Sequence, residues 1–287
     1  MPRNSQGYRR PRLWLEVFLW LNVAGLVPDI YLAHSMNQFR RPQEYLPLYF
    51  SLAAPPLLLI GLAAWLLGGR VTLWRALGEI VGWAAIVVGV LGLIFHLESR
   101  FFQELTLASL VYSAPFAAPL AYTALGLMLI MNRRVDPDSE EWPRWVLLFA
   151  LGGFVGNFVF SLADHASNGF FHATEWVPVI SSGLAVGFLL VPFLMTVRCG
   201  YLAICAAVML LQGAVGVLGF YHHFSASWHG PANSLFGNLI SGAPVLAPLL
   251  FADVMLLALL GLWVLWQHVP AEMGEQSERA ITVPSTH

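Results

Sequence analysis

The chain has 287 residues, of which 58% are hydrophobic and 10% are charged, with a formal net charge of −2. A soluble domain carries about 25% charged residues, so this composition excludes an ordinary soluble protein. The near-zero net charge and short basic clusters argue against nucleic-acid binding. Apolar runs of about 20 residues are long enough, as helices, to cross a hydrocarbon core of about 30 Å. We therefore expect an all-α polytopic membrane protein surrounded by the lipid bilayer.

Hydropathy predicts eight transmembrane helices. In chain order they cover residues 13–33, 46–67, 77–97, 105–131, 145–163, 176–197, 201–221 and 236–266. The fourth and eighth runs are long, so we expect those helices to tilt or to extend past the bilayer. A polar linker, 132–144, separates a first unit of four helices, 1–131, from a second, 145–267. The remaining residues, 268–287, form a polar tail that is expected to be flexible.

The arginines predict the orientation of these helices. An even number of spans leaves both termini on one side, and the chain has no lysine. Eleven arginines fall on the terminal side and three on the other: Arg3, Arg9, Arg10, Arg12, Arg70, Arg75, Arg133, Arg134, Arg144, Arg198 and Arg279, against Arg40, Arg41 and Arg100. Positive residues favour the cytoplasmic side. Both termini are therefore expected in the cytoplasm, with a bacterial cytoplasmic membrane as the expected location.

The two units resemble each other in sequence. Residues 11–39 parallel 143–170, and both segments end in the frame H-x-x-N-x-F. "GVLGLIFH" (89–96) aligns with "GVLGFYHH" (216–223), and 110–120 aligns with 239–249 through L-x3-A-P-x2-A-P-L. These matches predict two parallel four-helix repeats, related by a pseudo-two-fold axis along the membrane normal. The prolines of the last frame are expected to kink or start the fourth and eighth helices.

Four histidines occupy paired positions in this repeat: His34 with His165, and His96 with His223. Each is expected at the outer end of a helix. Imidazole is the commonest metal ligand, and a nearby carboxylate can fix its tautomer. Two arrangements are open. His34/His96 and His165/His223 could hold two haems b, or all four could surround one copper or zinc ion. The plain alternative is that polar residues simply end helices at the membrane interface.

Other ionisable residues are secondary candidates in the same outer layer: His222, Asp164, Asp29 and Glu98. Asp253 lies inside the eighth predicted helix and is a candidate for a proton-relay or partner-binding group. Ionisable side chains within the membrane are costly and are often functional.

Residues 216–244, "GVLGFYHHFSASWHGPANSLFGNLISGAP", resemble the helix of haem–copper oxidases and nitric oxide reductases that ends in paired histidines. His222 and His223 match that pair, which implies haem or copper chemistry. The resemblance covers a small part of the chain, and the sequence has fewer spans and no His-x3-Tyr/Glu partner. In outline, two four-helix units with paired histidines are also similar to haem A synthase. The ligand-bearing spans and the Glu motif of that family differ here.

The leading hypothesis is an integral membrane protein that binds haem or a metal and acts in redox or cofactor handling. A tandem-repeat transporter of ions or small solutes is the first alternative, because of Asp29, Asp253 and the proline-broken helices. A structural or assembly subunit of a larger membrane complex is the second. The expected protein partner is a membrane complex or a redox partner. No catalytic motif stands out, so no catalytic residue is assigned.

Overall fold

A computed structural model describes residues 5–98, 100–106, 109, 115, 117–167 and 169–269. Within these ranges the chain is helical and contains no strand. The helices are α1 (Ser5–Ser35), η1 (Pro42–Glu44), α2 (Tyr45–Gly68), α3 (Val71–Leu97), α4 (Arg100–Glu104), α6 (Leu120–Arg134), α7 (Glu141–Ser167), η2 (Ala173–Glu175), α8 (Trp176–Leu194), α9 (Cys199–Trp228), α10 (Leu235–Ser241) and α11 (Leu249–Trp266). Seven are long and apolar enough to cross a membrane: α1, α2, α3, α7, α8, α9 and α11.

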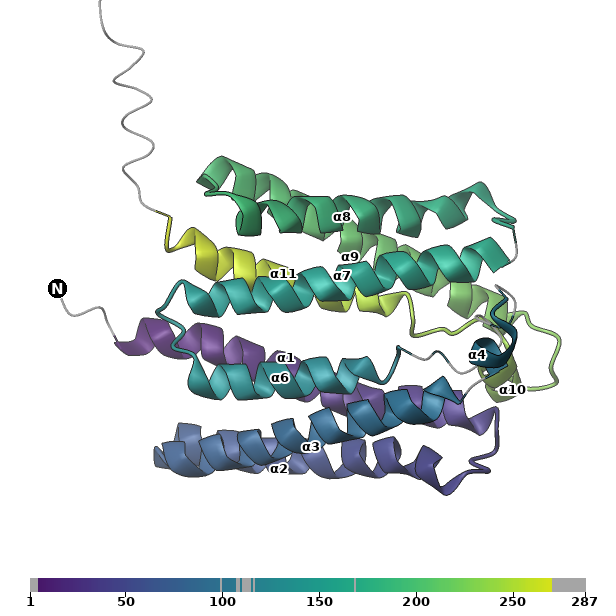
Figure 1. The fold of residues 1–287 in the computed structure, drawn as a ribbon, viewed down its shortest axis with the longest axis horizontal. Helices are drawn as coiled ribbons and strands as arrows, with labels where there is room; N and C mark the ends of the chain where they lie inside the picture. The colour runs from purple at the N-terminus through teal and green to yellow at the C-terminus, as the bar shows by residue number, and fades with distance from the viewer. Residues whose placement is uncertain are drawn as a thin grey trace, which may run out of the picture.

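The long helices form two groups that lie side by side (Figure 1). The first contains α1, α2, α3 and α6, and the second contains α7, α8, α9 and α11. In each group the last helix packs against the third and the first, and α1 also contacts α11 of the other group. We call the end where α1 begins and α11 ends the proximal end. The opposite end, where α1 leads into α2, is the distal end.

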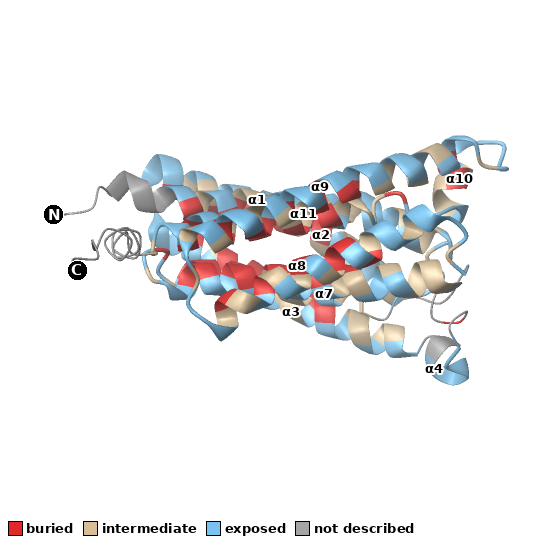
Figure 2. Cartoon of the chain, turned by 90° about the horizontal axis from the view of Figure 1, so that it is seen from above, coloured by how far each residue is buried: buried red, intermediate tan, exposed pale blue. Residues whose placement is uncertain are grey.

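Burial follows the surfaces where the helices face one another, and the outward surfaces are exposed (Figure 2). Small and aliphatic side chains such as Ala150, Ala185 and Leu189 are fully buried. Large apolar side chains such as Ile60 (55% exposed) and Leu210 (59% exposed) point outward. A soluble protein seldom exposes so much apolar surface. In a membrane the same surface contacts lipid, as expected for an all-α integral membrane protein.

The fourth and eighth predicted helices are shorter than the hydropathy runs. The fourth helix was expected over 105–131, but α6 begins only at Leu120 and has 15 residues, which is a length of about 22 Å. The eighth helix was expected over 236–266, but this segment divides into α10 and α11. Pro119 and Pro248 are the N-caps of α6 and α11. Proline has no N–H to donate and its ring clashes with a preceding turn, so it starts a helix more readily than it continues one.

Candidate functional site

The four paired histidines lie at the distal ends of four different helices. His34 is in the last turn of α1, His96 in the last turn of α3, and His165 in the last turn of α7. His223 lies five residues before the end of α9. All four side chains are half-buried.

The chain turns in the same way after His34 and after His165. The backbone N–H of Phe39 donates to the carbonyl of His34 at 3.3 Å, and that of Phe170 to the carbonyl of His165 at 2.9 Å. Both phenylalanines have a positive φ, 49° and 54°. Their rings lie 5.8 Å and 6.3 Å from the imidazole of the same turn. In both turns, the phenylalanine five positions after the histidine therefore lies beside the imidazole ring.

The Nδ1 atom of every one of these imidazoles faces an acceptor. It lies 3.1 Å from the carbonyl of Ile30 in His34. The corresponding distances are 3.0 Å to Pro115 for His96 and 2.9 Å to Pro244 for His223. A carbonyl only accepts, so Nδ1 carries the proton in these three rings and the Nε2 lone pair is available. No described residue hydrogen-bonds Nε2 in any of them.

His165 differs from the other three because its Nδ1 faces a carboxylate. Nδ1 lies 3.6 Å from Oε2 of Glu175, a distance suited to an ion pair and too long for a hydrogen bond. The side chains are 18% and 15% exposed. A carboxylate at this place favours the same tautomer as a carbonyl would, with the proton on Nδ1.

Glu44 is the counterpart of Glu175, and the sequence comparison overlooked it. Both follow the paired histidine by ten positions and precede an aromatic residue, Tyr45 or Trp176. In each, Oε2 is buried and has no hydrogen-bond partner. His34 and Glu44 are both near enough to His96 to act on it electrostatically. The frame H-x9-E-[YW] was readable in the sequence. Glu175 already stood among the acids expected in the outer layer, and the frame would have added Glu44 to them.

The described residues nevertheless form no group of three or more His, Cys, Asp or Glu side chains that could hold a metal ion. The secondary candidates spread around the distal end. His222 is exposed, and Asp164 is half-buried. Glu98 is exposed and pairs with Arg41 at 3.4 Å, an ion pair that contributes little at the surface. Asp29 is exposed in the isolated chain, near enough to His34 to interact electrostatically.

Asp253 lies away from this layer, at the contact between the two groups of helices. Its Oδ1 accepts a hydrogen bond from Nδ2 of Asn22 at 2.9 Å. Asn22 belongs to α1 and Asp253 to α11, so the bond joins the first group to the second. The next residue along α11, Val254, lies against Gly153 of α7, within the second group.

A second polar cluster, buried near the proximal end, was also missed by the sequence analysis. Arg133 of α6 forms a two-pronged ion pair with Glu16 of α1, and the side chains are 1% and 3% exposed. Asn132 donates to Glu16 at 2.8 Å, and Trp142 of α7 donates to Asn132 at 3.3 Å. The guanidinium also lies 4.0 Å from the ring centroid of Trp74. The only sequence signal was Glu16 itself, a carboxylate inside a predicted span that needs a partner.

A glycine on α3 leaves room for the guanidinium of this cluster. Gly78 of α3 lies against the guanidinium of Arg133, where a Cβ atom would collide with it. The carbonyl of Trp74 accepts from Nε of Arg133 at 3.3 Å. Because Trp142 begins the second group, the cluster also fixes the start of α7 against the first group. Its burial and its position between the two groups of helices point to a structural role.

Comparison with protein-family models, with curated proteins and with solved structures finds no match to this chain.

Proposed function

We propose that this chain is an integral membrane haem protein acting in redox or cofactor handling. One haem b would lie between His34 and His96, and a second between His165 and His223. The observation that carries the proposal is the shared state of the four imidazoles: Nδ1 faces a carbonyl or a carboxylate, and Nε2 is left as the binding atom. Histidine ligands of metals are held in this way by their second nitrogen.

A haem accounts for the arrangement better than a bare ion does. Haem iron takes its axial ligands singly or in pairs, whereas zinc or copper centres usually take three or four protein ligands. No trio of ligands is assembled among the described residues. The proposal therefore takes the two-ligand form, with a copper or zinc centre as the form to be tested against it.

The proposal includes an internal repeat of two parallel four-helix halves with eight membrane crossings, α6 being the fourth. Matching contacts support it. His96 bonds the carbonyl of Pro115 as His223 bonds that of Pro244. A Cβ atom on Gly89 would lie 2.8 Å from the carbonyl oxygen of Pro119, and one on Gly216 would lie 2.9 Å from that of Pro248.

The proposed orientation puts the distal end outside a bacterial cytoplasmic membrane and both termini in the cytoplasm. It rests on the arginines: among the described residues nine lie toward the proximal end and three toward the distal end, while Arg3 and Arg279, also counted in the sequence, lie outside the described residues. The histidines would then face the outer side, where a redox partner or another membrane complex could reach them.

An absorption spectrum of the purified protein, with a pyridine haemochrome assay for stoichiometry, tests the cofactor. We expect a Soret band and two haems per chain. His34→Ala/His96→Ala and His165→Ala/His223→Ala should each lose one haem, because each pair serves one site. His222→Ala is the matched control and should keep both, since its ring is exposed. Protein without a Soret band would refute the haem proposal. Bound copper or zinc in such protein would favour the single-ion form, and the absence of iron, copper and zinc would exclude both forms.

A transporter is the second candidate, and the Asn22–Asp253 bond favours it. Duplicated carriers place polar groups where their halves meet within the membrane. This candidate gains if the spectrum and metal analysis are both blank while proteoliposomes take up a solute in an Asp253-dependent manner.

A further inference from the structure

Polar side chains run along the inside of the second helix group, from its distal end toward its middle. On α7 they are His165, Ser161 and Asn157, spaced four residues apart and therefore on one face. Next to α7 they are Glu175, the last residue of η2 and the N-cap of α8, and Ser182 of α8, seven positions further along the chain. We call this set, with Gln212 of α9, the polar line.

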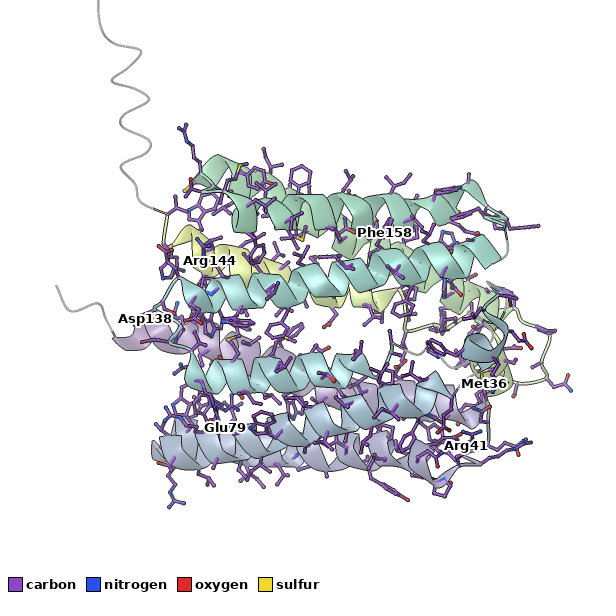
Figure 3. The ribbon with its side chains drawn as sticks, viewed as in Figure 1. Met36, Arg41, Glu79, Asp138, Arg144 and Phe158 are labelled. Atoms are coloured by element: carbon purple, nitrogen blue, oxygen red, sulfur yellow. The ribbon has the colours of Figure 1, made fainter. Side chains whose placement is uncertain are left out.

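Contacts fix the α7 and α8 parts of the polar line side by side. His165 and Glu175 meet at the distal end, with 3.6 Å between Nδ1 and Oε2. Two turns deeper, Phe158 of α7 lies against Gly183 of α8, where a Cβ atom would be 3.6 Å from the ring. Figure 3 shows Phe158 between these two helices. Asn157 and Ser182, next to this contact, are 7% and 0% exposed.

Two amide groups at the deep end of the polar line lack partners. Nδ2 of Asn157 is a buried donor without an acceptor, and Oε1 of Gln212 is a buried acceptor without a donor. Gln212 is level with Asn157, because its Nε2 donates to the carbonyl of Ser181 at 2.9 Å. α7 and α9 both pack against α8. Gln212 bonds Ser181 and Phe158, next to Asn157, contacts Gly183, so both amides are buried near the same turn of α8. Leaving one such group unsatisfied costs about 1–3 kcal/mol.

The first helix group offers an apolar comparison. The residues four and eight positions before His34 are Ile30 and Leu26, where the second group has Ser161 and Asn157. Ile30 packs with Val88 and Tyr122 in a small buried cluster. The Tyr122 hydroxyl is satisfied there, bonding Ser51 and donating to the carbonyl of Pro47. At the positions that match Ser161 and Asn157, the first group therefore has apolar side chains, and Ile30 packs in a hydrophobic cluster.

The polar line stops below Asn157 and Gln212. The next inward-facing layer consists of Phe154, Ala185 and Met209, all 0% exposed and part of the hydrophobic core. Any hydrated path would therefore end blind in the middle of the group.

We propose that the polar line is a blind water-filled inlet from the distal face to the middle of the second helix group. The ligand is water, the smallest molecule that can donate to Gln212 Oε1 and accept from Asn157 Nδ2. The inlet brings protons and water to mid-group depth without leaking across the membrane. It requires no cofactor at His165, so it stands or falls separately from the haem proposal.

Silver-ion accessibility of single cysteines tests the inlet, because Ag⁺ is close to water in size and reaches thiols only through water. Ser161→Cys and Asn157→Cys are compared with the matched variants Ile30→Cys and Leu26→Cys in the full-length protein. After Ag⁺ treatment the protein is denatured, and the thiols left free are labelled with a maleimide and assigned by mass spectrometry. We expect Ser161→Cys and Asn157→Cys to react roughly tenfold faster than their counterparts.

Native Cys205 serves as the folding control, since it is 0% exposed and free. A variant in which Cys205 reacts is not folded. If either Ser161→Cys or Asn157→Cys fails in this way, the other variant decides the result. Protection of both Ser161→Cys and Asn157→Cys to the level of Ile30→Cys would overturn the proposal. Equal reactivity of all four cysteines would also overturn it, since water would then enter both helix groups regardless of polarity.

Discussion

Among single residues, Arg133 and its neighbour Arg134 show that burial decides how much an ion pair matters for stability. Its neighbour Arg134 pairs with Glu79 at 3.0 Å on the surface, with 57% of the arginine side chain exposed. Arg133 pairs with Glu16 inside the protein, with 1% exposed. Removing one partner of a buried pair leaves an uncompensated charge, whereas water solvates the survivor of an exposed pair.

Glu16→Ala should therefore lower the free energy of unfolding by about 3–5 kcal/mol. Glu79→Ala, which strands the exposed Arg134, should leave stability nearly unchanged. The double variant Glu16→Met/Arg133→Met should recover much of the loss, because it removes both charges. Unfolding by denaturant in detergent micelles measures all three. Equal effects of Glu16→Ala and Glu79→Ala would contradict a buried role for the Arg133 pair.

At the level of the elements, glycine and proline set how α6 and α11 dock. Each helix begins after a proline, and the third helix of its group meets that proline with two glycines. A Cβ atom on Gly92 would lie 2.8 Å from Cβ of Pro119, and one on Gly219 would lie 2.8 Å from Cβ of Pro248. These contacts are too close for any larger residue, so the helices of each pair approach through glycine.

Gly89→Ala and Gly216→Ala should each lower stability, by about 1–3 kcal/mol, because the added methyl group forces the helices apart. The two losses should be similar, since the contacts are. Gly187→Ala is the control: no atom lies within 4 Å of a Cβ there, and alanine favours the helix. Thermal unfolding of the three variants provides the measurement. A loss at Gly187 as large as at Gly216 would show that these close contacts are not the cause.

For the whole molecule, the paired helix groups leave two ends that can be told apart by charge. Arg40 is exposed at the distal end, in the turn after α1, and Glu140 is exposed in the turn between α6 and α7 at the proximal end. If the arginine distribution sets the orientation, these turns lie on opposite sides of the membrane.

A membrane-impermeant maleimide applied to intact cells should label Arg40→Cys and spare Glu140→Cys. Permeabilised cells should show both labelled, because both positions are exposed in the fold. The reverse pattern would invert the proposed topology and place the histidine layer on the cytoplasmic side. Labelling of both cysteines in intact cells would contradict a membrane separating the two turns.

Several features of the fold were predictable because they depend on local composition. Long apolar runs predict helices in a bilayer wherever they fold, and seven such helices are confirmed. The prolines were expected to kink or start the fourth and eighth helices, and Pro119 and Pro248 are the N-caps of α6 and α11. The sequence did not say which proline starts each helix. The lengths of these helices were overestimated, because hydropathy averages over a window and does not register where the backbone breaks.

The sequence by itself determined the helical, membrane-embedded class and the chain positions of the four histidines, since both depend on residues near in sequence. Only the tertiary structure decided that Glu16 meets Arg133, that Asn22 meets Asp253, and that Glu44 and Glu175 carry buried oxygens without a donor. The first two facts join residues on different helices, and the third depends on what packs around each carboxylate. Hydrophobic periodicity indicates which face of a helix is buried, whereas the identity of the facing residue depends on how the helices pack against one another.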